Sequence, residues 1–155
     1  MSEIVWQIDH SVETDASPDF AWRYLTNVRN WDDPPAQFSL DGPFAPGSEG
    51  TTLMPGRDPV KWHISDVQPG RSYSLETRLP DATLVFTWQF DAVSDRRTRL
   101  TQHIMLSGDS AAAYAPQIEA SFGANLRAGM DRIAGTIAMA EARVRQATPQ
   151  VSDGG

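Results

Sequence analysis

No other stretch of the sequence limits the possible folds as strongly as residues 10 to 31, HSVETDASPDFAWRYLTNVRNW. Between Ile4 and Thr14 the sequence alternates. The even positions 4 to 12 hold apolar residues and His10, and the odd positions 7 to 13 hold polar residues. Such alternation is typical of a strand with one buried face. Ser17 can cap a helix and Pro18 suits a first helical turn, so we expect a short helix directly after this strand.

Six more strand-like segments follow, separated by turn-forming pairs such as Pro55-Gly56 and Pro69-Gly70. These pairs preset turn dihedrals, so successive strands should form antiparallel hairpins. Two short helices are expected before this series, and Asn30–Pro35 is expected to end them. Asp32 and Asp33 could do acid-base work if their pKa values were pushed apart, but the favoured interpretation is that they cap a turn. The predicted strands are Gln37–Leu40, Gly50–Met54, Val60–Val67, Tyr73–Leu79, Thr83–Asp91 and Arg97–Leu106.

One long helix is predicted from Ala115 to Gln146, with Pro116 marking its start or a kink. Glycines inside a helix cost about 1 kcal/mol each relative to alanine, so this helix must be stabilised by packing. Arg127, Asp131 and Arg145 lie opposite its apolar side. The apolar stripe consists of Ile118, Phe122, Leu126, Ile133, Ile137, Ala140 and Val144.

The order of elements predicts an α+β fold. An antiparallel sheet needs one face covered, and the C-terminal helix is the only predicted element long enough to cover it. We expect a curved antiparallel sheet of about seven strands wrapped around that helix. Residues 1–147 would form a single domain, and residues 148–155 a disordered tail.

Composition excludes several classes of protein. The chain of 155 residues has a net charge of -7 with scattered basic residues, so no nucleic-acid partner is expected. It has no cysteine, which excludes disulfides and thiolate chemistry, and no phosphate-binding or metal-ligand spacing stands out, so we expect no cofactor. The N-terminus lacks a signal-peptide pattern and no apolar run reaches about 20 residues. We expect a cytoplasmic protein, not inserted in a membrane, that is a monomer or homodimer.

The order of the elements, together with the segment from Val12 to Trp31, forms a pattern that spans the domain. Its residues are Ala16–Trp22 leading to Leu25, then Trp31, Leu40-Asp41-Gly42, Gly47 and the Pro69-Gly70-Arg71 turn. This pattern resembles the START/SRPBCC superfamily, which includes polyketide cyclase/dehydrase and lipid-transport-like proteins. This resemblance implies the helix-grip fold, in which the curled sheet and the long helix enclose a cavity for a hydrophobic or amphipathic ligand. It spans about residues 4–146, and it implies lipid or other hydrophobic-ligand binding.

Residues facing such a cavity follow from strand parity and the helical stripe. Thr77 and Gln102 are polar among apolar inward positions, and each needs a hydrogen-bond partner from a ligand, a strand or a water. Trp31 is expected near the cavity entrance. The predicted ligand-binding residues are Trp31, Trp62, Tyr73, Leu75, Thr77, Phe86, Trp88, Gln102, Ile104, Phe122, Asn125 and Leu126.

Three side chains are candidates for acid-base catalysis: His10, Tyr73 and Glu119. His10 has inward parity, whereas His63 and His103 should point outward. Each candidate also has a purely structural interpretation, such as a histidine bonded to backbone at the sheet rim. The leading hypothesis is therefore a binding protein for a small hydrophobic or aromatic ligand. A cyclase/dehydratase-like enzyme and a non-enzymatic protein-partner module remain as alternatives.

Overall fold

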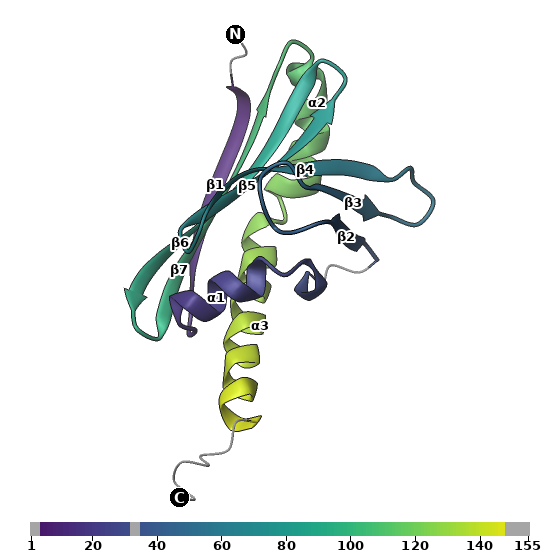
Figure 1. The fold of residues 1–155 in the computed structure, drawn as a ribbon. Helices are drawn as coiled ribbons and strands as arrows, with labels where there is room; N and C mark the ends of the chain where they lie inside the picture. Colours follow the sequence, from purple (N-terminus) through teal and green to yellow (C-terminus); the bar gives the residue numbers. More distant parts are fainter. Residues whose placement is uncertain (1–3, 32–34, 148–155) are drawn as a thin grey trace, which may run out of the picture.

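The computed structural model describes residues 4–31 and 35–147 (Figure 1). The expected tail and the Asp32-Asp33 pair lie outside these residues. The 3-10 helix is labelled η1 and a π-helical turn η2. The elements are β1 (Ile4–Thr14), α1 (Pro18–Leu25), η1 (Val28–Asn30), β2 (Gln37–Asp41), β3 (Glu49–Leu53), β4 (Val60–Gln68), β5 (Ser72–Leu79), β6 (Ala82–Ser94), β7 (Arg97–Ser107), α2 (Ala111–Ile118), η2 (Glu119–Gly123) and α3 (Leu126–Ala147).

The seven strands form one antiparallel sheet with the order β1-β7-β6-β5-β4-β3-β2. Strands β2 to β7 are joined as successive hairpins, and β1 pairs with β7 at the far edge. The sheet curves, and α1 and α3 lie on its concave side (Figure 1). The predicted α+β architecture is therefore confirmed, including the short helix after the first strand.

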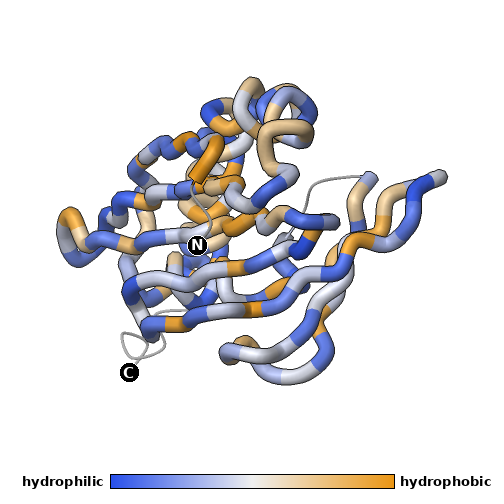
Figure 2. The backbone as a smooth tube through the Cα atoms, turned by 90° about the horizontal axis from the view of Figure 1, so that it is seen from above, coloured by the Kyte–Doolittle hydropathy of each residue, from blue (hydrophilic) through white to orange (hydrophobic). Residues whose placement is uncertain are grey.

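Strand parity separates the two faces as expected. Hydrophobic and hydrophilic residues alternate along the strands (Figure 2), because successive side chains point to opposite faces. The register aligns inward residues into rows across the sheet. In one row His10 on β1 is opposite Gln102 on β7, which is opposite Trp88 on β6, which is opposite Tyr73 on β5.

The C-terminal helix differs from the prediction of one continuous helix over Ala115–Gln146. The chain forms α2, a π-helical turn and α3, with Ala124 N donating to Glu119 O at 3.1 Å. The turn folds the Glu119 carboxylate over Gly123, where a Cβ would lie 1.7 Å from Glu119 Oε2. Val144 was predicted in the buried stripe but is 52% exposed, because the last turns of α3 extend past the sheet (Figure 1).

A polar junction ties β1, α1 and α3 together. Thr14 Oγ1 donates to Ala134 O of α3 at 2.6 Å. Ser17 caps α1, as predicted, by accepting from Phe20 N at 3.2 Å. The backbone N–H and the hydroxyl of Ser17 also donate to the two carboxylate oxygens of Glu141, at 3.1 and 3.0 Å. Glu141 is only 7% exposed, so a charged residue anchors the long helix to the start of the short one.

Candidate functional site

Aromatic side chains occupy the space between α1 and the concave face of the sheet. The Trp22 ring packs edge-to-face on Phe90 at 5.1 Å and on Tyr73 at 6.0 Å between ring centroids. Phe44 reaches Tyr73 from the loop after β2 at 4.9 Å. This end of the inner face is consequently filled by the protein's own rings.

Tyr73 is the central member of this group and is 1% exposed. Its hydroxyl donates to Leu25 O at 3.5 Å. Burial raises the pKa of Tyr73 far above its usual range, because the phenolate would be desolvated. The hydroxyl therefore keeps its proton and serves as a hydrogen-bond donor rather than as a base.

Trp31 and Trp62 lie at the end of the inner face formed by β2, β3 and β4. Their ring centroids are 5.5 Å apart, and both indole N–H groups are satisfied. Trp31 Nε1 donates to Leu25 O at 2.9 Å, and Trp62 Nε1 donates to Thr52 Oγ1 at 3.0 Å. These bonds fix both rings, so Trp31 closes this side of the concave face against the end of α1.

Other predicted ligand-binding residues lie together between β5, β6, β7 and the helices. Leu75, Phe86 and Ile104 are opposite one another on β5, β6 and β7, and Phe122 of η2 packs edge-to-face on Phe86 at 5.2 Å. Leu126 is buried in the same core. Phe122 thus connects the break in the helix to the middle of the sheet.

Two inward polar residues retain hydrogen-bonding capacity. Thr77 is 7% exposed and lies opposite Leu84, while Gln102 is half-buried between His10 and Trp88. Within residues 4–31 and 35–147, neither side chain makes a hydrogen bond. Asn125 differs from the expectation of a residue facing a ligand. It is exposed, and its Nδ2 donates to Ser121 O at 3.3 Å across the helix break.

Glu119 lies at the margin of the concave face, on the π-helical turn. It is exposed, and its Oε1 accepts a hydrogen bond from Trp6 Nε1 at 3.3 Å. Trp6 is an inward residue of β1, opposite Leu106 on β7. The carboxylate is therefore held at the β1 edge of the sheet, and β7 separates β1 from β6 and β5, which carry Phe90 and Tyr73.

His10 is half-buried and borders a hollow of about 530 Å³ between β1 and α3. The other catalytic candidates, Tyr73 and Glu119, do not line this hollow, and neither do the predicted ligand-binding residues. On its helical side the hollow carries Arg127 and Asp131, which the sequence pattern places opposite the apolar stripe of the helix but does not assign to a site. Nothing in the local sequence places these two residues beside β1. The lining residues are His10, Ser11, Val12, Glu13, Thr14, Asp15, Arg127, Asp131, Ala134, Gly135 and Ala138.

The other two histidines lie on the outer face. His103 Nε2 is 2.8 Å from Gln7 Oε1, and Gln7 belongs to the polar side of β1. His63 is opposite Glu49 on β3 and Glu76 on β5, while its neighbours Trp62 and Ile64 are buried. Both orientations agree with the parity prediction.

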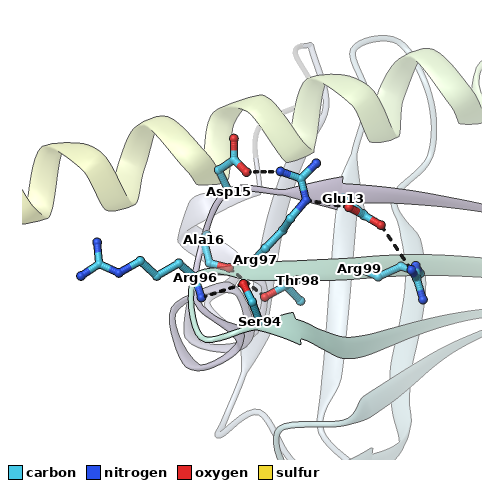
Figure 3. Close-up of polar contacts among 8 residues, drawn as sticks. All are labelled: Glu13, Asp15, Ala16, Ser94, Arg96, Arg97, Thr98 and Arg99. Carbon is cyan, nitrogen blue, oxygen red and sulfur yellow. Dashed lines mark hydrogen bonds and ion pairs between the residues drawn. The ribbon is translucent and has the colours of Figure 1, made fainter.

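An ionic network joins the edge strand β1 to β7 on the outer side (Figure 3). Arg97 Nε bonds Glu13 Oε1 at 2.6 Å, and its NH1 bonds Asp15 Oδ1 at 2.5 Å. Arg99 NH2 bonds the other oxygen of Glu13 at 3.2 Å. The hydrogen bonds from Arg97 and then Arg99 lower the pKa of Glu13. The two carboxylates that border the hollow from this side are thus already matched with cations.

The described part of the chain contains no group of three or more histidine, cysteine, aspartate or glutamate residues arranged to hold a metal ion. Nor does any helix among these residues have the length and hydropathy needed to span a membrane.

The curved antiparallel sheet around a C-terminal helix defines the helix-grip class of folds. The profile of the family described as polyketide cyclase / dehydrase and lipid transport matches residues 5–138. The chain belongs to this family, and the expected relationship to the START/SRPBCC superfamily is confirmed. Comparison with curated protein sequences gave no match.

Solved structures support the same fold. A point mutant of norcoclaurine synthase from Thalictrum flavum, in complex with a transition-state analogue, has a TM-score of 0.69 and 13% identity, covering 90% of this chain and 98% of its own. The aromatase/cyclase Zhui from a Streptomyces species has a TM-score of 0.67 and 18% identity, covering 96% and 99%. A Thermobifida fusca protein solved by NMR has a TM-score of 0.69 and 15% identity, covering 84% and 92%. At these identities the likeness concerns the fold.

Proposed function

We propose that the protein binds a small hydrophobic or aromatic molecule between the concave face of the sheet and the C-terminal helices. Family membership supports a ligand-binding or cyclase-like role. The observation that carries the proposal is that Thr77 and Gln102 make no hydrogen bond within the described residues, although the inward residues before and after each of them on its own strand are apolar. No described side-chain nitrogen or oxygen is both fully buried and without a partner, so these two polar groups reach solvent. A ligand oxygen or nitrogen would take the place of that water as their hydrogen-bond partner.

The neighbourhood of Thr77 and Phe86 is the part of the concave face we assign to the ligand. Phe86 and Phe122 offer ring faces and edges for an aromatic molecule, and Thr77 offers one hydroxyl to orient it. A mostly apolar site with few polar groups is typical of small-molecule pockets. Binding would require the Phe122 side chain to move, because it now packs on Phe86.

Native mass spectrometry of the purified protein tests the proposal directly, and we expect a co-purified small molecule. A second assay measures the fluorescence of an anilinonaphthalene dye titrated into the wild type and into Phe86→Ala and Thr77→Val. We expect the dye's dissociation constant to change in both variants. Thr83→Val is a matched control, because Thr83 lies on β6 with outward parity. Equal dye binding in all four proteins would contradict the proposed location.

A cyclase-like enzyme is the second candidate, favoured by the position of His10. It is the only described histidine on the inner side of its strand, and it is directly opposite Gln102, whose amide can orient an imidazole or a substrate carbonyl. Turnover of candidate polyketones by His10→Gln tests this alternative. A loss of roughly a hundredfold or more is expected from removing a general base, and unchanged turnover would remove His10 from that role.

A further inference from the structure

The hollow between β1 and α3 lies outside the aromatic part of the concave face. β1 and α3 run in the same direction, because Trp6 bonds Glu119 before α3 and Thr14 bonds Ala134 within it. The beginning of the lining segment on β1, at His10, therefore lies beside the beginning of the helical lining. The two sides of the hollow together cover residues 10–15 and 127–138.

The helical side carries two opposite charges one turn apart, Arg127 and Asp131. In the part of the chain that the structure describes, no ion pair or hydrogen bond engages either side chain. The order of the two residues along the helix favours this lack of pairing, since an acid four residues before a base pairs better on a helix than a base four residues before an acid. Farther along α3, Glu141 precedes Arg145 and the two pair at 2.8 Å. Arg127 and Asp131 have the unfavourable order and remain available.

The β1 side does not neutralise them. Glu13 and Asp15 border the hollow, but both bind Arg97, and Glu13 also binds Arg99 (Figure 3). The free charges of the hollow are therefore one cation and one anion, placed about 5–6 Å apart at their Cβ atoms by helical geometry.

Beyond the charges, the wall of the hollow is made of small residues. Ala134, Gly135 and Ala138 line it, and a Cβ built on Gly135 would meet nothing within 4 Å. This leaves space for an uncharged, compact group beside the charged pair. The hollow is open to solvent, since Arg127, Asp131 and Gly135 are exposed, and its volume of about 530 Å³ exceeds what a bare ion would occupy.

We propose that this hollow binds a small zwitterion, with a carboxylate on Arg127, an ammonium on Asp131 and an apolar remainder over the small residues. A guanidinium matches a carboxylate with two parallel hydrogen bonds, and Asp131 supplies acceptors for the ammonium. His10, at the Arg127 end, adds a ring nitrogen for a further hydrogen bond. The site is separate from the hydrophobic ligand proposed above.

An NMR titration with fragments tests the proposal. The ¹⁵N-labelled protein is titrated with γ-aminobutyrate, glycine, acetate and methylammonium at constant ionic strength. We expect amide shifts in residues 10–15 and 127–138, with the tightest binding for γ-aminobutyrate because its charges are about one helical turn apart. Arg127→Gln and Asp131→Asn should each weaken it about tenfold, the effect of losing one charged hydrogen bond.

Arg143→Gln is the matched control, since Arg143 is exposed on the same helix and outside the hollow. It should bind γ-aminobutyrate like the wild type. Equal affinity for acetate and γ-aminobutyrate would overturn the proposal, as would an unchanged affinity for γ-aminobutyrate in Arg127→Gln or the absence of shifts in the lining residues of the wild type. The affinity of Arg127→Gln for the fluorescent dye distinguishes this proposal from the hydrophobic site proposed above. Weaker binding of γ-aminobutyrate with unchanged dye affinity would show that the two ligands bind at different places.

Discussion

Gly50 and Trp62 show how tightly single residues determine the β2–β4 end of the sheet. Gly50 is opposite Trp62 in the β3–β4 ladder, and a Cβ on it would lie 2.2 Å from the indole ring. The ring cannot retreat easily, because its N–H is bonded to Thr52 and its other side faces Trp31. Glycine is therefore required at this position by space rather than by backbone conformation.

We predict that Gly50→Ala lowers the free energy of unfolding by about 1–3 kcal/mol, the usual cost of overpacking a core. Urea denaturation monitored by tryptophan fluorescence measures it. Gly129→Ala is the opposite control: its Cβ would meet nothing within 4 Å in α3, so a gain of up to about 1 kcal/mol is expected from helix propensity. Equal effects of the two variants would contradict the steric argument.

At the scale of elements, Glu141 fastens α3 to α1. Its two carboxylate oxygens accept from the N–H and hydroxyl of Ser17, and Arg145 NH2 donates to one of them at 2.8 Å. The hydroxyl of Ser17 also caps α1. Removing the carboxylate would leave a partly buried N–H without its acceptor.

Glu141→Ala should therefore destabilise the protein by about 1–3 kcal/mol, the cost of an unsatisfied buried donor. Glu141→Gln keeps one acceptor and should cost less. A double-mutant cycle with Ser17→Ala, followed by thermal or urea unfolding, should give a coupling energy of at least about 0.5 kcal/mol. Additive effects of the two substitutions would show that the contact does not stabilise the junction.

The elements that sequence reasoning predicted correctly depend on local patterns. The bounds of β1 and the inward set on β5, β6 and β7 follow from alternation, which needs no knowledge of the partner strand. At the break over Glu119–Gly123, Glu119 accepts a hydrogen bond from Trp6, 113 residues away in the chain, and Glu141 of α3 is bonded to Ser17, which is also distant in the chain. Neither contact has a local signature.

The candidate site was predicted less completely for the same reason. Trp62, Phe86 and Ile104 lie on the inner face because parity determines it. The charges of the β1–α3 hollow could not be predicted from one helix, since Arg127 and Asp131 define a site only once β1 is placed beside α3. Pairwise packing of elements distant in sequence is the missing information.

At the scale of the whole molecule, the ionic network links stability to pH. The pKa of Glu13 lies below its ordinary value of 4.5 in the folded state, because of hydrogen bonds from Arg97 and Arg99. Its contribution is therefore complete above the unfolded-state pKa and is lost as the pH falls through the lower folded-state pKa.

We predict that the melting temperature of the wild type falls more steeply than that of Glu13→Gln between about pH 5 and pH 2. Differential scanning fluorimetry over this range measures both proteins. Because the network is at the surface, raising the salt concentration should reduce the difference. Parallel curves at low salt would contradict a role for Glu13 in acid sensitivity.

The position of β1 beside β7 has a consequence for how the chain is made. β1 is synthesised first, yet its only partner strand in the described sheet is β7, residues Arg97–Ser107. A ribosome must therefore complete the whole series of hairpins before β1 can dock, and α3 follows later still. Until then the nascent chain carries an unmatched strand, Ile4–Thr14, with its apolar side open to chaperones and to neighbouring polypeptides.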